Sequence, residues 1–224
     1  MKMKLNECLC ELVGAFIGDG HFGRYGKRRN QWLVGFVGHI DLDYDYLKNK
    51  IYLVIKKHFS DTNPRIYKRP KENTVRVIVY SKEIVEFLLS LGFKFGNKSK
   101  TAFLPNKLIH NNIQLKYIIR GLFNTDGSIF FDKRKTYSQP YPRICLNLNN
   151  PQLINQTHLL LKERFSINSR MNFDHSRIQI NGRKNVLIFQ DKIGFSNERH
   201  LVKIRKIKPL EGLSDLKDTC LEDI

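Results

Sequence analysis

The 224-residue sequence predicts an α+β fold of two similar halves, each with the element order helix, hairpin, helix, hairpin, helix. Segments of helical periodicity alternate with pairs of short segments of strand type, and this order starts again near the middle of the chain. The two copies are offset by 107 residues, because an Asp-Gly pair follows the first helix of each half, at positions 19 and 126. We therefore expect two pseudo-symmetric αββαββα units, each with one antiparallel sheet.

Periodic apolar residues and turn signals define the elements of the first half. Helices are expected at residues 5–18, 45–59 and 81–91. Strands are expected at residues 21–25, 31–39, 65–68 and 74–80. The first helix ends at Gly18-Asp19-Gly20, a basic turn joins the first two strands, and Ser81 is the expected N-cap of the third helix.

The second half repeats this order of elements with little identity in sequence. Helices are expected at residues 113–124, 152–165 and 184–193. Strands are expected at residues 128–132, 143–148, 169–173 and 177–180. The repeat predicts a first half at 1–105, a linker at 106–112, a second half at 113–210 and an acidic tail at 211–224.

The chain carries 39 Lys and Arg against 21 Asp and Glu, a formal net charge of +18. Such a field favours nucleic-acid phosphates or anionic lipid as partners. Lipid is the weaker candidate, because no stretch approaches the roughly 18–20 apolar residues of a membrane span and the first residues do not resemble a signal peptide. We expect an intracellular, cytoplasmic protein without a membrane partner, and a eukaryotic organelle stays open as its location.

The predicted hairpins carry cations at alternate positions, as expected for sheets with helices on one face and solvent on the other. Arg and Gln read base edges through paired hydrogen bonds, whereas Lys more often neutralises phosphate. Two such sheets side by side would form a long basic saddle for double-stranded DNA. The expected DNA contacts are Arg24, Arg28, Arg29, Gln31, Arg65, Arg69, Arg76, Lys133, Arg134, Arg143, Arg170, Arg177, Gln179 and Arg183.

Each half also places an acid at the end of its first helix. The negative end of the helix dipole lies there, so a carboxylate destabilises the helix by about 0.3–1 kcal/mol. Breaking this rule at equivalent places in both halves indicates function. Small residues four apart permit close packing of the two helices, and they are Gly14, Gly18, Gly121 and Thr125. Such packing would bring Asp19 and Asp126 together. Adjacent carboxylates favour a divalent cation such as Mg²⁺, so we expect metal-dependent phosphodiester hydrolysis.

The segments LVGAFIGDG (12–20) and IRGLFNTDG (119–127) resemble the paired signature helices of LAGLIDADG homing endonucleases in their single-chain form. This resemblance extends through about Ile207. It implies a monomeric, intron-encoded enzyme that cuts both strands of a long pseudo-palindromic DNA site, with a stagger across the minor groove, using Mg²⁺ or another divalent cation such as Mn²⁺. It also implies that Asp19 and Asp126 are catalytic metal ligands, and that the backbone carbonyls of Gly18 and Thr125 add metal contacts.

Members of this family commonly have a basic residue near each active site. Gly96-Asn97-Lys98-Ser99 resembles the segment that supplies it in the first half, so Lys98 is the candidate catalytic residue that stabilises developing negative charge or holds the attacking water. The parallel segment 194–200 of the second half has no Lys-Ser pair. Arg199, His200 and Lys203 are the open alternatives there, and unequal cleavage of the two strands is a possible consequence.

Two other classes of protein stay open on the sequence alone. The first is a non-cleaving nucleic-acid binder of the same fold, either a maturase that acts on intron RNA or a DNA-binding regulator. The second is a general packaging protein without sequence preference or metal requirement. Loss of either acid would favour the first alternative, and both acids are present.

Overall fold

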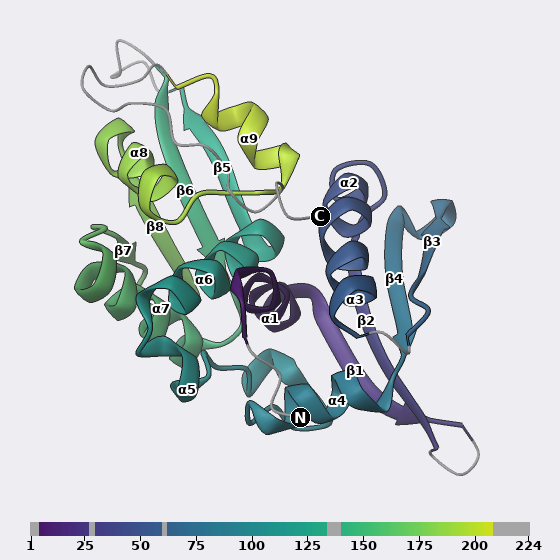
Figure 1. Ribbon diagram of the computed structural model, residues 1–224. Coiled ribbons are helices and arrows are strands. Elements are labelled where there is room, and N and C mark those ends of the chain that lie inside the picture. Colours follow the sequence, from purple (N-terminus) through teal and green to yellow (C-terminus); the bar gives the residue numbers. More distant parts are fainter. Residues whose placement is uncertain (1–4, 27–29, 60–61, 134–139, 208–224) are drawn as a thin grey trace.

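The computed structural model describes residues 5–26, 30–59, 62–133 and 140–207. Within these residues, the strands form two four-stranded antiparallel sheets, one in each half (Figure 1). The helices α1 (Glu7–Asp19) and α6 (Asn112–Asp126), called the motif helices below, pack against each other between the sheets. The predicted α+β fold of two αββαββα halves joined through these helices is confirmed.

The first half follows the predicted order closely. Its strands are β1 (Gly20–Tyr25), β2 (Gln31–His39), β3 (Arg65–Arg69) and β4 (Thr74–Tyr80). Its remaining helices are α2 (Tyr44–Tyr46), α3 (Leu53–His58) and α4 (Lys82–Ser90), with a π-helical segment at Leu47–Tyr52. The helix expected over 45–59 is therefore one continuous helical stretch with a π segment inside. Ser81 caps α4 as predicted, since its side chain accepts a hydrogen bond from the Ile84 amide.

The second half contains two short helices that the sequence did not predict. Its strands are β5 (Gly127–Asp132), β6 (Tyr141–Asn147), β7 (Arg170–Met171) and β8 (Arg177–Asn181). Its helices besides α6 are α5 (Asn106–Ile109), α7 (Pro151–Phe165), α8 (Arg183–Lys192) and α9 (Glu198–Ile204). The unpredicted ones are α5, inside the expected linker, and α9. The strand expected over 169–173 stops early, because the Asn172 and Asp174 side chains accept amide hydrogen bonds that turn the chain toward β8.

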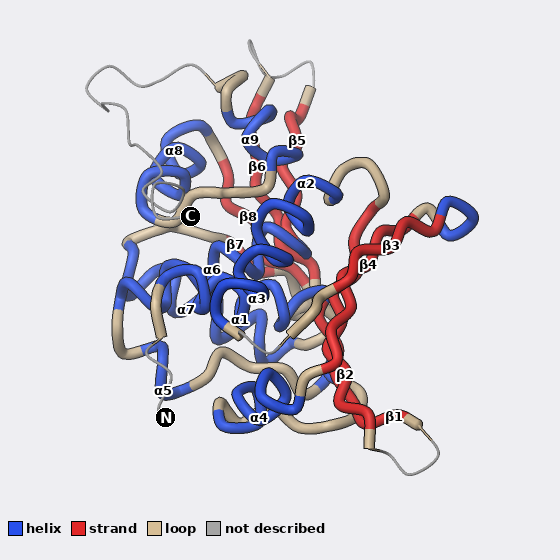
Figure 2. The backbone as a smooth tube through the Cα atoms, turned by 45° about the vertical axis from the view of Figure 1, so that its right-hand side comes forward, coloured by secondary structure: helices blue, strands red, loops and turns tan. Residues whose placement is uncertain are grey.

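Both sheets have the same topology, with the strand orders β1-β2-β4-β3 and β5-β6-β8-β7. One face of each sheet is covered by helices, and Figure 2 shows this for the first sheet. Alternate residues of the central strands fill the core beneath the helices, among them Val75, Val77, Val79, Ile178 and Ile180. The opposite face, called the open face below, is covered by no helix within the described ranges. None of the described helices is long and apolar enough to cross a membrane.

Candidate active site between the motif helices

The motif helices approach each other at backbone contact. A Cβ atom on Gly14 would overlap the carbonyl oxygen of Ile118, and one on Gly121 would overlap that of Glu11. A side chain at either position would push the helices apart, so glycine is required there. This close packing places the C-terminal ends of α1 and α6 side by side near the middle of the molecule (Figure 1).

The two predicted acids, Asp19 and Asp126, are the last residues of α1 and α6 and are half-buried. Burial and the neighbouring Asp126 carboxylate raise the pKa of Asp19 to about 7. Burial also raises the pKa of Asp126 to about 6, although Lys98 and Arg199 favour its charged form. A pocket of about 370 Å³, lined in part by Gly18, Lys98 and Asp126, opens beside the acids. Perturbed carboxylates in a cleft are typical of a functional site.

Lys98 lies at the end of α1, as predicted from the sequence. Its Nζ donates hydrogen bonds to the backbone carbonyl oxygens of Phe16 (2.6 Å), Ile17 and Gly18. Neither motif helix has a basic residue in its last turn, so Lys98 brings from elsewhere in the chain the positive charge that a helix C-terminus favours. Burial lowers the pKa of Lys98 to about 8.

Arg199 occupies the corresponding place at the end of α6. Its Nη2 donates hydrogen bonds to the carbonyl oxygens of Asn124 (3.0 Å) and Thr125. Its Nη1 forms an ion pair with the buried carboxylate of Asp43 at 2.9 Å. Each of the two acids therefore comes directly after backbone carbonyls that accept hydrogen bonds from a basic side chain of a distant segment. This pseudo-symmetry singles out Arg199 among the three alternatives that the sequence left open.

The segments that carry the two cations begin in the same way. The Asn97 side chain accepts a hydrogen bond from the amide of Ser99 at 3.0 Å, and the Asn197 side chain accepts one from the amide of Arg199 at 3.2 Å. Both asparagines thus cap a short helical turn. The basic residue is the first after the asparagine in one half and the second in the other, which is why a Lys-Ser pattern does not find Arg199.

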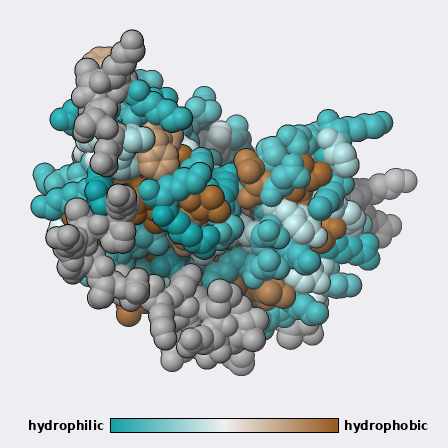
Figure 3. Space-filling model, turned by 90° about the horizontal axis from the view of Figure 1, so that it is seen from above, coloured by the Kyte–Doolittle hydropathy of each residue, from teal (hydrophilic) through white to brown (hydrophobic). Residues whose placement is uncertain are grey.

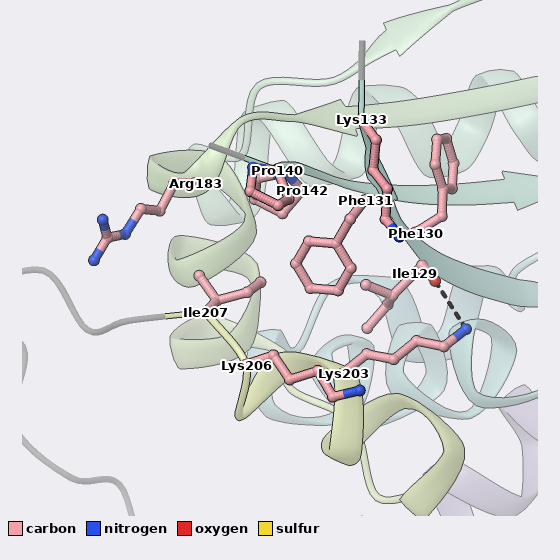
Figure 4. A pocket seen from close by; sticks show the side chains of 10 residues that line it. All are labelled: Ile129, Phe130, Phe131, Lys133, Pro140, Pro142, Arg183, Lys203, Lys206 and Ile207. Atoms are coloured by element: carbon pink, nitrogen blue, oxygen red, sulfur yellow. Dashed lines mark hydrogen bonds between the residues drawn. The ribbon is translucent and has the colours of Figure 1, made fainter. Parts of the chain in front are cut away.

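The other two alternatives contact different groups: His200 accepts a hydrogen bond from Nε of Arg199 at 3.1 Å, and Lys203 contacts the second sheet. His200 is buried, and burial together with Arg199 lowers its pKa to about 3, so it carries no charge near neutrality. Lys203 donates a hydrogen bond to the carbonyl oxygen of Ile129 at 2.9 Å, on the helix-covered side of the second sheet (Figure 4). Arg199 is therefore the alternative whose position matches that of Lys98, and its role as the second basic residue stays a prediction.

The donor atoms around the acids fit a hard divalent cation. The described residues contain no cluster of three or more His, Cys, Asp and Glu side chains suited to a metal. Asp19 and Asp126 would therefore need carbonyl, water and phosphate oxygens to complete the coordination, which Mg²⁺ commonly uses. The carbonyl oxygens of Gly18 and Thr125 already accept hydrogen bonds from cationic side chains. A second lone pair on each oxygen stays available for a metal.

Most described members of the predicted DNA-contact set lie on the open faces. In the first sheet, Arg65 and Arg69 of β3 stand opposite Ile78 and Thr74, and they share their face with Arg76. In the second sheet, the register places four predicted contacts on one face, namely Arg143, Arg170, Arg177 and Gln179. Figure 3 shows two lobes with a notch between them and hydrophilic residues over most of both. Gln31 is exposed at the start of β2.

Three predicted contacts lie on the helix-covered side of their sheets instead. Arg24 stands opposite Trp32 in the register, and its guanidinium stacks 4.6 Å from that ring, so it lies on the helix-covered side. Lys133 and Arg183 line a pocket of about 520 Å³ beneath the second sheet, and Arg183 points away from its centre (Figure 4). Arg28, Arg29 and Arg134, like the acidic tail at 211–224, lie outside the described residues.

Comparison with known proteins agrees with this geometry. Residues 114–194 match the family model of the LAGLIDADG-like domain. Over 88% of this chain and 97% of the other, the structure is similar to that of I-DmoI solved in complex with DNA and Ca, with a TM-score of 0.61 and 16% identity. The N-terminal LAGLIDADG domain of DUF199/WhiA is similar over 87% of this chain and 86% of its own, with a TM-score of 0.54 and 18% identity. The chain thus has the fold of these two proteins, and its second half matches the LAGLIDADG-like domain.

Similarity in sequence extends to much longer proteins. The replication factor C small subunit of Methanocaldococcus jannaschii is 29% identical over 205 residues, which are 90% of this chain and 10% of that protein. A DNA polymerase of Thermococcus hydrothermalis is 27% identical over 157 residues, which are 68% of this chain and 8% of that protein. The chain thus spans at most a tenth of the length of these relatives, and the similarity concerns one segment of each.

Proposed function

We propose that the chain is a site-specific DNA endonuclease that uses a divalent cation, Mg²⁺ or Mn²⁺, at the paired acids Asp19 and Asp126. The observation that carries this proposal is the pair of helix ends, where each acid follows carbonyls bound by a cation and both lie between two basic sheets. Structures of I-DmoI with DNA and Ca, and with DNA and Mn, support a DNA substrate and a divalent cation.

The chemistry assigns a role to each part of the site. A divalent cation, when bound, supplies an activated water and stabilises the charge that develops on the scissile phosphate. Asp19 and Asp126 would hold this cation, and Lys98 and Arg199 would place positive charge beside the scissile phosphates. The open faces bind the duplex on either side, so a monomer reads a long pseudo-palindromic site and cuts its two strands with a stagger.

Removing the positive charge of either Lys98 or Arg199 should slow the cutting of one strand more than that of the other. We expect Lys98→Met and Arg199→Met each to reduce the rate on its own strand by about 10–100-fold, the range for groups just outside a metal centre. Single-turnover cleavage of a duplex with differently labelled strands measures this, with the exposed neighbour Lys100→Met as the matched control. Equal slowing of both strands by each variant would contradict the assignment.

The open faces should read the two half-sites separately. Arg65 and Arg170 occupy equivalent places in the two sheets. Across the strands, Arg65 is in line with His21, and Arg170 is in line with Ser128. His21 and Ser128 each lie two positions after the acid of their half. We expect Arg65→Ala and Arg170→Ala to relax base preference in opposite halves of the site, by about 1–3 kcal/mol per lost base contact. Competitive binding to a library measures this. Arg183→Ala, on the helix-covered side, should leave both preferences unchanged.

Cleavage of a randomised duplex library, with Mg²⁺ and with EDTA, tests the proposal. We expect one long sequence to be cut on both strands in Mg²⁺ and none in EDTA. Tight, sequence-selective binding without cutting in any divalent cation would refute the endonuclease, and intron RNA would be the next substrate to test.

A further inference from the structure

A carboxylate inside the packed motif helices takes no part in the proposed metal centre. Glu11 of α1 is fully buried, and its Oε1 accepts hydrogen bonds from the Tyr46 hydroxyl (3.2 Å), the Asn124 amide (3.1 Å) and the Ser196 hydroxyl. Its other oxygen, Oε2, lies 3.9 Å from the buried ammonium of Lys50. One carboxylate of the first half thus binds two side chains of the second half.

The hydrogen bonds continue from Glu11 to the segment that carries Arg199. The Oδ1 atom of Asn124 accepts the backbone amides of Ser196 and Asn197, both at 3.2 Å. The Asn197 side chain in turn donates to Asp43 at 2.7 Å and to the Asn124 carbonyl oxygen at 3.1 Å. Residues 196–199 are therefore fixed against the end of α6, and two members of this network, Asn124 and Ser196, are bonded to Glu11.

Among the described residues of the first half, Lys98 has no such network. The residue of α6 that corresponds to Glu11, offset by 107, is Ile118, which is buried and apolar. Lys98 bonds directly to the carbonyls of α1, and its segment is fixed locally by Asn97, which accepts the Ser99 amide and hydroxyl. The two basic side chains of the site, Lys98 and Arg199, are therefore positioned by different contacts. A substitution at Glu11 changes the contacts of the Arg199 segment only.

We propose that Glu11 is a positioning residue for Arg199 and thereby controls the cutting of one strand. The inference rests on the proposed endonuclease function. Buried hydrogen bonds are stronger than exposed ones, and a network of them loosens when one acceptor is lost. Without the Glu11 acceptor, Ser196 and Asn124 lose a shared partner, so Arg199 is held less firmly at the carbonyl of Thr125 although its ion pair with Asp43 remains. The strand that depends on Lys98 keeps its rate.

Strand-resolved cleavage by three variants tests the role of Glu11. Glu11→Ala removes the acceptor, Ser196→Ala removes one donor without leaving a buried charge unpaired, and Glu11→Gln keeps an acceptor oxygen. We expect Glu11→Ala and Ser196→Ala to slow one strand about tenfold, so that nicked DNA accumulates, and Glu11→Gln to restore most of the rate. Thr157→Val, which removes a buried hydroxyl bonded within α7, should leave the ratio of the two rates unchanged. Equal slowing of both strands by Ser196→Ala would overturn the inference.

Hydrogen exchange decides the question even if the wild type cuts no DNA, an outcome that would refute the endonuclease. In Ser196→Ala we expect the amides of residues 195–200 to exchange at least several-fold faster than in the wild type. The amides of residues 97–101, beside Lys98, should exchange at wild-type rates. Unchanged exchange at 195–200 would show that the network does not position Arg199.

Discussion

Replacing Asp19 or Asp126 with Asn is expected to abolish cleavage and at the same time to stabilise the fold. Loss of a metal ligand removes roughly 4 kcal/mol of transition-state stabilisation, which is about a thousandfold in rate. The pKa of Asp19 is raised from its ordinary value of 3.8 to about 7, so its charged form is unfavourable in the folded protein. A neutral amide relieves that repulsion, and we expect a gain on the order of 2 kcal/mol in the free energy of unfolding without metal.

The sign of the pH dependence follows from the same shift. The folded protein binds more protons than the unfolded chain between about pH 4 and pH 7, so stability without metal should fall as pH rises through this window. Denaturant unfolding in EDTA at pH 8, together with cleavage in Mg²⁺, measures both effects. Asp43→Asn is the control, because it breaks the ion pair with Arg199 and should destabilise by roughly 3 kcal/mol. Acid variants that lose both stability and activity would indicate a structural role.

Gly121→Ala is expected to lower the free energy of unfolding by about 3 kcal/mol or more. A methyl group there overlaps the carbonyl oxygen of Glu11, a backbone atom that cannot turn away. The motif helices would have to separate, which also moves Asp19 and Asp126 apart. We expect the folded fraction to cut DNA at least about a hundredfold more slowly, because small displacements of reacting groups carry such costs. Thermal unfolding and cleavage at a temperature where the variant is folded measure the two effects.

Ala15→Gly provides the matched control for this steric effect. Ala15 lies in α1 next to Gly14 and is fully buried. Its replacement by glycine removes a buried methyl group and lowers the helix propensity, but adds no atom that could push the helices apart. We expect this substitution to lower the free energy of unfolding by about 1–2 kcal/mol and to leave cleavage intact. Similar losses of stability and of cleavage in Gly121→Ala and Ala15→Gly would show that backbone contact between the helices is not what sets the geometry of the acids.

The fold was predictable because its signals are local. Ser81 caps α4, an Asp-Gly pair ends each motif helix, and apolar residues alternate through β4, so each half could be placed by pattern. The two helix ends also pointed to both acids, whereas Lys98 was predicted from the resemblance of segment 96–99 to a known family. The register of an exposed strand end depends on pairing with its neighbour, so the sequence could not show that Arg24 shares a face with Trp32.

The second basic residue and its support could not be read from the sequence. Arg199 reaches the end of α6 through α9, a helix of seven residues whose only local signal is the Asn197 cap. Glu11 reads as one acid in an apolar helix, and its meaning depends on Ser196, a residue 185 positions away. Contacts of that separation follow from how the two halves pack, which short-range patterns do not encode.

Binding of Mn²⁺ to the protein on a duplex target, followed by electron paramagnetic resonance, tests the central claim most directly. The account predicts bound Mn²⁺ in the wild type, and affinity at least about tenfold weaker in Asp19→Asn and in Asp126→Asn while DNA binding persists. Lys100→Met should bind Mn²⁺ as the wild type does. Unchanged Mn²⁺ affinity in both acid variants would contradict the claim that these two helix ends form the metal centre.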